Sequence, residues 1–287
     1  MGSNVREMSI PTGCTVKDLV ALGTSGLIFR DTSTTVIKFP NADDEFALVN
    51  VEIERDIYER FTKQGGHEGL LKYFGSFETG IRLEYASNQG ILQYLREHKN
   101  DISVKQRIQW CQEISCTLAF IHSNKVVHGD FKCDNIFLDD SLRSKVADFG
   151  GSSMDGSELR IMVSASHRGP RDLKPIEEDI FALGSTMYEI MTGQAPYNGH
   201  EEEEIVDLFT KSKFPNTISL GPIGNIIQNC WQGKYARAHE VWTSVTVIQK
   251  RHGSLHDSPY ASKTTAIFAI GAICLLGIYW NRRSANR

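Results

Sequence analysis

Two short segments hold most of the side chains that could do chemistry. HGDFKCDN at 128–135 is followed by DFG at 148–150. Together they supply carboxylates, an amide and a lysine, and carboxylate and amide oxygens are the ligands that Mg²⁺ prefers. Either segment alone would pass for a solvated turn, with Gly150 closing the second one. In this order and at this separation, they indicate a site that binds metal ions and positions a charged group.

The two segments resemble the catalytic loop, HRDLxxxN, and the DFG triplet of eukaryotic protein kinases. The resemblance implies transfer of the terminal phosphate of ATP with Mg²⁺ as cofactor. It implies that Asp130 accepts the substrate proton or orients its hydroxyl, and that Lys132 meets the transferred phosphoryl group. Asn135 and Asp148 would hold magnesium through oxygen atoms. The position of Lys132, two residues after Asp130, fits the serine/threonine kinases better than the tyrosine kinases.

Residues 20–28, VALGTSGLI, resemble the glycine-rich turn that covers the phosphates of ATP in this family. Glycines allow the backbone to approach a phosphate closely. An ordinary Gly-Thr-Ser-Gly turn is the alternative. The matching positions are Ala21, which replaces the first glycine, Gly23, Gly26 and Ile28.

Lys38 ends the apolar sequence VIK and matches the family's phosphate-binding lysine after a very short hairpin. In the family, a glutamate on the following helix pairs with this lysine. Residues 50–61 have a broad apolar face at helical spacing. Glu54 is the best match for the partner of Lys38. Glu52 and Glu59 are the bland alternatives, since a glutamate on an amphipathic helix is usually just solvated.

Residues 81–95, IRLEYASNQGILQYL, resemble the strand and hinge that join the two lobes of a kinase. The resemblance implies that Leu83 is the gatekeeper and that Glu84 and Ala86 offer backbone groups to the adenine edge. Phe137 would form the floor under adenine. A plain buried strand and helix start is the alternative.

Residues 177–193 resemble the long buried helix of the larger lobe. The resemblance implies that Asp179 binds the backbone of the catalytic loop, while Gly184 permits close packing. Arg171 stands where the family's APE motif has a glutamate that pairs with an arginine. Because Arg237 would repel Arg171, we expect another carboxylate to compensate, or a looser segment.

Gly129 replaces an arginine that commonly receives an activation-loop phosphate in kinases. Its presence favours a segment 150–169 that does not depend on phosphorylation, and it predicts constitutive activity. Together with Ala21 and Arg171, it also leaves a pseudokinase scaffold as an alternative. A small-molecule phosphotransferase of related fold is a third interpretation, although DFG and the Asp179 helix favour a protein kinase.

The composition fits one two-lobed α+β unit. The chain has 287 residues, 40% of them hydrophobic, and a net charge of -4, so nothing indicates a nucleic-acid partner. Its six cysteines form no CxxC pair, which argues against a zinc site or a disulfide framework and favours a reducing compartment. The expected parts are an N-terminal extension 1–14 and a kinase domain 15–250 with a β-rich N-lobe at about 15–83, a hinge at about 84–90 and a mainly helical C-lobe at about 91–250.

The last part of the chain has a different character. After a polar linker at 251–263, residues 264–280 carry no charge, and a basic tail follows at 281–287. At 1.5 Å per residue the apolar stretch would reach roughly 25 Å, which is short for a bilayer but workable. We expect a single transmembrane helix, and the alternative is a buried or docking helix.

The position of this stretch near the end of the sequence resembles that of tail-anchored proteins, which implies a kinase domain in the cytosol. The N-terminal sequence has no apolar signal core, and Arg6 breaks the usual myristoylation pattern. The expected membrane is the mitochondrial outer membrane or the endoplasmic reticulum. The expected partners are this membrane and a protein with an acceptor serine or threonine.

Overall fold

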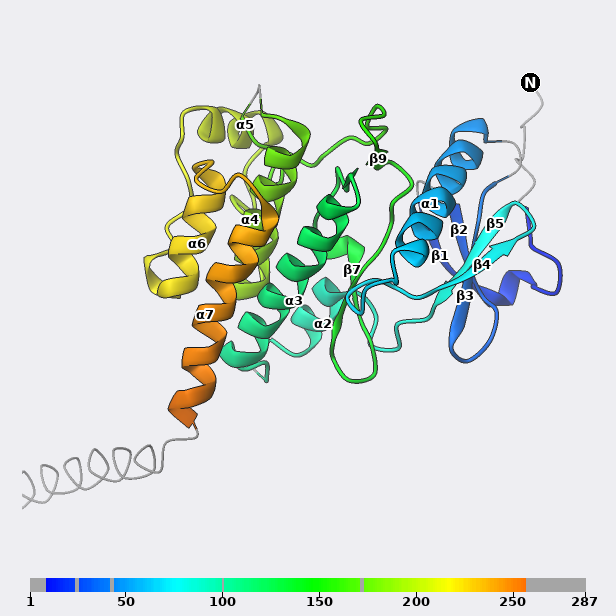
Figure 1. Cartoon of the computed structure of the whole chain (residues 1–287), viewed down its shortest axis with the longest axis horizontal. Helices are drawn as coiled ribbons and strands as arrows, with labels where there is room; N and C mark the ends of the chain where they lie inside the picture. The colour runs from blue at the N-terminus through cyan, green and yellow to red at the C-terminus, as the bar shows by residue number, and fades with distance from the viewer. Residues whose placement is uncertain (1–8, 24–25, 42–43, 100, 171–172, 257–287) are drawn as a thin grey trace, which may run out of the picture. The chain divides into compact units, whose positions relative to one another are not determined.

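A computed structural model describes residues 9–23, 26–41, 44–99, 101–170 and 173–256 (Figure 1). The chain divides into one compact unit that ends at Thr246 and a second unit that begins at Val247. All the residues discussed below as a candidate site lie in the first unit.

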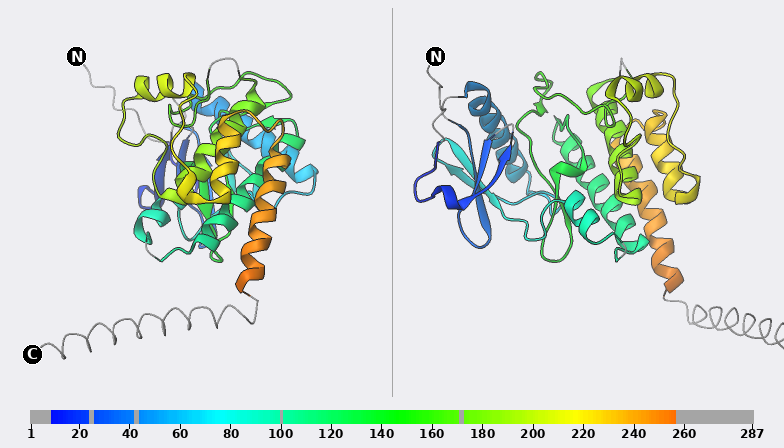
Figure 2. Two further views of the ribbon diagram at one scale, coloured as in Figure 1. Left: turned by 90° about the vertical axis from the view of Figure 1, so that its left-hand side faces the viewer. Right: turned by 180° about the vertical axis from the view of Figure 1, so that it is seen from behind.

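Residues 19–84 of the first unit form a five-stranded antiparallel sheet and one long helix (Figure 2). The strand order is β1-β2-β3-β5-β4. Because side chains alternate between the two faces of a strand, Phe29, Ile37 and Phe39 form an apolar cluster on one face, and Lys38 lies on the other. The strands are β1 (Leu19–Gly23), β2 (Gly26–Arg30), β3 (Thr35–Phe39), β4 (Tyr73–Phe77) and β5 (Gly80–Glu84).

Helix α1 spans Glu45–Lys63 and begins at an N-cap. The carboxylate of Asp44 accepts hydrogen bonds from the backbone of Phe46 and Ala47, which satisfies two amides of the first turn. The helix buries one stripe at spacings of three and four residues, so the helix predicted over 50–61 is confirmed and begins earlier than predicted. Its buried members include Val51, Glu54, Ile57, Tyr58 and Phe61.

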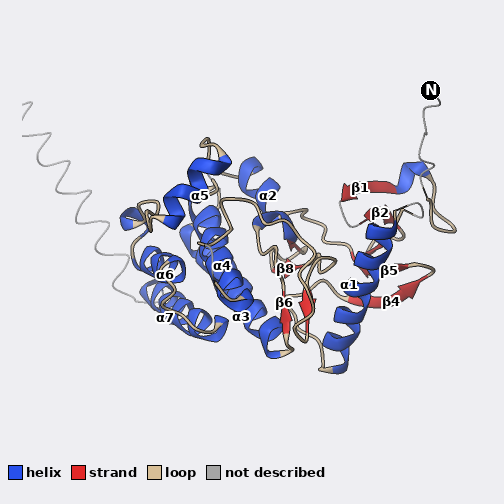
Figure 3. Cartoon of the chain, turned by 90° about the horizontal axis from the view of Figure 1, so that it is seen from above, coloured by secondary structure: helices blue, strands red, loops and turns tan. Residues whose placement is uncertain are grey.

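The rest of the first unit is mainly helical, with α3 and α4 side by side (Figure 3). Helix α4 also packs on α6 through Gly184, where an added Cβ would lie 2.7 Å from Cys230 Cβ. The helices are α2 (Ile91–Glu97), α3 (Val104–Ser123), α4 (Pro175–Thr192), α5 (Glu202–Thr210), α6 (Pro222–Trp231) and α7 (Ala238–His256). The short strands are β6 (Val126–Val127), β7 (Ile136–Leu138), β8 (Ser144–Val146) and β9 (Ser153–Met154). Three 3₁₀ turns complete the elements: η1 (Val16–Asp18), η2 (Cys133–Asn135) and η3 (Ile218–Leu220).

The C-terminal boundary differs from the prediction. Helix α7 continues to His256, so the first residues of the predicted linker 251–263 are helical. Residues 251–256 contain no proline, and a helix tolerates a single glycine such as Gly253. Within the described ranges, no helix is long and apolar enough to cross a bilayer. The predicted span 264–280 and tail 281–287 lie outside those ranges.

Candidate active site

The catalytic loop brings its three predicted side chains together. Asn135 Nδ2 donates to the backbone oxygen of Asp130 at 2.8 Å and to Asp130 Oδ2 at 3.0 Å. Lys132 Nζ lies 2.8 Å from the same Oδ2 atom. The other carboxylate oxygen, Asp130 Oδ1, is buried and has no hydrogen-bond partner among the described residues. Because a buried acceptor without a partner is costly, this atom is suited to a ligand hydroxyl.

Asp179 on α4 holds the start of this loop, as predicted. It is 1% exposed, and it accepts from the backbone of His128 at 2.8 Å and of Gly129 at 2.9 Å. A third contact, at 2.9 Å, joins its carboxylate to His122 Nε2 on α3. One side chain thus fixes two consecutive peptide groups next to Asp130, which makes the loop rigid.

Lys38 and Glu54 form the predicted ion pair. Lys38 Nζ lies 2.5 Å from Glu54 Oε2 and 2.6 Å from Asp148 Oδ1. Burial works to lower the pKa of Lys38, but the charges of Asp148 and Glu54 outweigh it and raise the pKa above its ordinary value. Glu52 is exposed, so it is excluded as the partner of Lys38. The lysine therefore keeps a positive charge between two carboxylates from different elements.

The DFG triplet turns sharply at Asp148, whose φ of 66° is unusual for a residue with a side chain. Phe149 is fully buried, and its backbone amide donates to Glu54 Oε1 at 3.3 Å. Its ring centroid lies 5.3 Å from that of Tyr58 and 5.1 Å from that of His128. These contacts anchor the triplet between α1 and the catalytic loop and direct Asp148 toward Lys38.

The glycine-rich turn joins β1 to β2, with Ala21 paired to Ile28 and Gly23 paired to Gly26. An added Cβ at Gly26 would lie 2.9 Å from the carbonyl oxygen of Phe39. Gly26 also has a φ of +151°, so its place requires glycine. The β2–β3 register sets Ile28 opposite Lys38, which brings the turn and the lysine to one part of the sheet.

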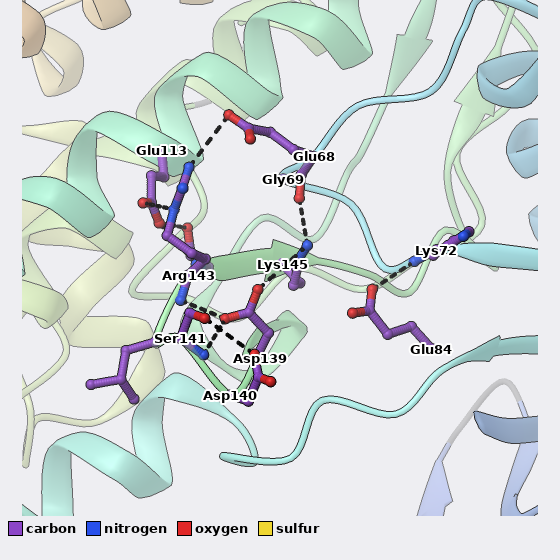
Figure 4. Close-up of polar contacts among 12 residues, drawn as sticks. Glu68, Gly69, Lys72, Glu84, Glu113, Asp139, Asp140, Ser141, Arg143 and Lys145 are labelled. Atoms are coloured by element: carbon purple, nitrogen blue, oxygen red, sulfur yellow. Dashed lines mark hydrogen bonds and ion pairs between the residues drawn. The ribbon is translucent and has the colours of Figure 1, made fainter. Parts of the chain in front are cut away.

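The hinge follows β5. Glu84 donates its backbone amide to Lys72 O at 2.8 Å and accepts from Lys72 N through its carboxylate at 3.0 Å (Figure 4). Leu83 is buried. Ala86 packs in an apolar cluster against which Phe137 lies, which is where a floor beneath a planar base is expected.

A charged network beside the hinge ties the two lobes together (Figure 4). Arg143 contacts Glu113 on α3 and, at 3.3 Å, Glu68 in the loop before β4. Lys145 on β8 donates to the backbone oxygen of Glu68 at 2.7 Å and lies 3.6 Å from Asp139. These contacts fix the loop between α1 and β4 to the larger lobe.

A carboxylate that sequence reasoning missed anchors the segment before α4. Glu178 Oε2 accepts from the backbone amide of Gly169, two positions before Arg171, at 3.0 Å. Arg171 itself lies outside the described residues. Arg237, just before α7, pairs with Glu240 in the first turn of that helix at 3.2 Å. The run of carboxylates at 177–179 was the available signal, although it does not reveal which one turns back toward Gly169.

The donor set fits a magnesium ion. The Asn135 amide nitrogen is engaged by Asp130, which leaves its carbonyl oxygen as the atom for a metal. Asp148 has a side chain that is 38% exposed. Oxygen atoms from one amide and one carboxylate are a typical protein share of a Mg²⁺ site that substrate phosphates complete.

Cysteine chemistry plays no part in this geometry. The five cysteines among the described residues are free, and Cys133 in the catalytic loop is fully buried. Burial raises the pKa of its thiol well above the ordinary value. This environment suits a side chain that fills space and not one that reacts.

The two lobes, the buried lysine–glutamate pair and the loop on Asp179 define the protein-kinase class. A family model described as protein tyrosine and serine/threonine kinase matches residues 59–240. The chain therefore belongs to the protein kinase family.

Several curated proteins are similar to it. Protein kinase C-like 1 of Caenorhabditis elegans is 30% identical over 165 residues, which cover 52% of this chain and 23% of that protein. NUAK family SNF1-like kinase 1 of Mus musculus is 26% identical over 225 residues, 69% of this chain and 32% of that protein. A probable serine/threonine-protein kinase of Dictyostelium discoideum is 29% identical over 202 residues, 64% of this chain and 40% of that protein. The chain thus spans well under half of the length of each.

Proposed function

We propose that this protein is a serine/threonine protein kinase that uses MgATP. The observation that carries the proposal is the complete charged site: Lys38 lies within 2.6 Å of carboxylates on α1 and in the DFG triplet. The three charged side chains come from three different elements, which supports a working nucleotide site. The name of the similar Dictyostelium discoideum protein, a probable serine/threonine-protein kinase, supports the choice of acceptor.

The side chains divide the work in a way that phosphoryl transfer requires. The acceptor hydroxyl binds at Asp130 Oδ1, which takes its proton as the oxygen attacks the terminal phosphorus and the bond from that phosphorus to the bridging oxygen breaks, so that ADP leaves. Lys132 sits beside this carboxylate and neutralises charge on the transferred group, while Lys38 binds phosphate oxygens of ATP. Magnesium, when bound by Asn135 and Asp148, supplies further neutralisation of phosphate charge.

A substrate panel tests the class of reaction. The full chain is incubated with MgATP and with serine, threonine and tyrosine peptides, and separately with small-molecule alcohols. We expect phosphate transfer to the serine and threonine peptides only. The Asp148→Asn variant, whose fold should survive, should transfer none. Transfer to small molecules alone would identify a small-molecule phosphotransferase. A folded protein that transfers to nothing would support the pseudokinase alternative.

We also propose that residues 264–280 attach the protein to a membrane, with the kinase domain in the cytosol, at the mitochondrial outer membrane or the endoplasmic reticulum. The support is the uncharged sequence itself, bounded by Lys263 and the basic tail. Alkaline extraction of membranes tests it. Ile270→Lys with Ile273→Lys should release the protein, because each charge is costly in a bilayer. Extraction of the unaltered chain would contradict the proposal.

A further inference from the structure

The segment after the DFG triplet packs on the catalytic loop through apolar side chains. Gly129 has a φ of +80°, and an added Cβ there would lie 2.6 Å from Leu159 Cδ2 and 3.2 Å from Ile161 Cγ2. Leu159 and Ile161 therefore occupy the space that any side chain at position 129 would need. The absence of a side chain at Gly129 is what lets the segment approach the loop.

A second glycine completes this contact. An added Cβ at Gly151 would lie 2.9 Å from Ile161 Cβ. The backbone amide of Arg160, between the two apolar residues, donates to Gly151 O at 2.9 Å. Leu159 is half-buried and Ile161 is 37% exposed, whereas the neighbouring Met162 is 89% exposed. The packing is thus specific to positions 159 and 161 and not a general property of the segment.

The same segment reaches helix α1 at two points. Arg160 Nε donates to Asn50 Oδ1 at 3.4 Å, and its guanidinium lies 5.2 Å from the centre of the Phe46 ring. Farther along α1, Arg60 Nη2 lies 2.7 Å from Asp155 Oδ2. Because α1 carries Glu54, these contacts connect the segment to the helix that orients Lys38.

The hydroxyls of two serines at the start of the segment donate hydrogen bonds within the folded structure. Ser152 is buried and donates to the backbone oxygen of His128 at 2.8 Å. Ser153 is also buried and donates to the backbone oxygen of Ser157. Neither hydroxyl can take a phosphate without losing its hydrogen bond.

We propose that Leu159 and Ile161 are positioning residues: seated on Gly129 and Gly151, they hold the segment against the catalytic loop and α1, so that the active arrangement needs no phosphate. The link to activity rests on the proposed function. Apolar packing is present whenever the chain is folded, whereas a phosphate–arginine contact exists only after modification.

Hydrogen exchange of the full chain tests this proposal. Leu159→Ser with Ile161→Ser should raise the exchange rate of the Arg160 amide at least about tenfold, because local opening then costs less. The matched control, Met162→Ser, should leave it unchanged, and Leu159→Met with Ile161→Val should restore protection. Gly129→Ala should raise the exchange rate of the Arg160 amide as the two serine substitutions do, because its methyl group would displace Leu159. Wild-type protein treated with phosphatase should keep full protection.

Kinetics supply the second measurement. In the serine pair, kcat should fall about tenfold while the KM for ATP changes less than about twofold, since Leu159 and Ile161 pack directly on Gly129 and Gly151 and the segment reaches Lys38 only through α1. Unchanged exchange in both the serine pair and Gly129→Ala would overturn the proposal, and so would loss of protection after phosphatase treatment. Because exchange needs no catalysis, an inactive wild type with the expected exchange pattern would contradict only the proposed function.

Discussion

At the scale of single residues, the site depends on which charges are buried together. Glu54 is fully buried on α1 and contacts both Lys38 and the backbone amide of Phe149. It thus joins a strand, a helix and the DFG triplet through one carboxylate. Removal of that charge leaves Asp148 as the acidic neighbour of Lys38 among the described residues.

Glu54→Gln should therefore lower kcat/KM by about tenfold to a hundredfold, because a charged hydrogen bond contributes about 1.5–3 kcal/mol. The control is Glu52→Gln, which alters an exposed carboxylate on the same helix. Steady-state kinetics of both variants provide the check. Equal losses would show that the ion pair has no special role.

His167 makes stability depend on pH. It is buried beside the hydroxyls of Ser164 and Ser166, and its Nε2 lies 3.9 Å from Glu189 Oε2. Burial, followed by the charge of Lys132, lowers its pKa from 6.5 to about 3. Below pH 6.5 the unfolded chain binds a proton that the folded chain does not, so stability falls as pH decreases from 6.5 toward 3.

The expected contribution to this slope is at most about 1.4 kcal/mol per pH unit. Urea denaturation at several pH values between 4 and 7 measures it. His167→Gln should flatten the dependence, whereas His239→Gln, at an exposed position, should not. If the stability of His167→Gln changed with pH as steeply as that of the wild type, the imidazole would not stay neutral in the folded state.

At the scale of elements, sequence patterns predicted the parts whose spacing is regular. The apolar period over 50–61 predicted α1, whereas Glu54, Asp179 and Gly184 were predicted from the resemblance to protein kinases. Contacts between distant segments leave no such period. The packing of Leu159 on Gly129 and the turn of Glu178 toward Gly169 therefore became visible only in three dimensions.

Helix α4 supports the catalytic loop, so its packing is open to test. Gly184→Ala should destabilise the protein by about 1–3 kcal/mol, because the new Cβ meets Cys230 Cβ at 2.7 Å. Alanine's better helix propensity, about 1 kcal/mol, only partly offsets this. Gly90→Ala is the control, since its Cβ would have only Ile136 O nearby, at 3.9 Å. Equal denaturation midpoints for the two variants would contradict the close contact.

At the scale of the whole molecule, the site joins two lobes that are far apart in sequence. Lys38 comes from the sheet and Asp148 from the larger lobe, and the contacts of Arg143 and Lys145 with Glu68 secure the same junction beside the hinge. A nucleotide that binds both lobes should therefore stabilise the whole first unit, since it binds only the folded chain.

MgATP at about a hundred times its Kd should add about 2.7 kcal/mol of stability. Thermal denaturation with and without magnesium measures this. The Asp148→Asn variant should lose the magnesium-dependent part of the stabilisation by ATP. Without nucleotide, it should be as stable as the wild type. If magnesium made no difference to the wild type, the assignment of Asn135 and Asp148 as metal ligands would be wrong.

The most direct test of kinase activity is the rate of terminal phosphate transfer from MgATP to a serine or threonine protein substrate by the full chain. Asp130→Asn is the comparison, because it keeps the shape of the loop and removes the proton acceptor. We predict transfer by the wild type and a loss of at least about a hundredfold in the variant. Equal transfer by both proteins, or none by a folded wild type with magnesium present, would contradict the proposed function.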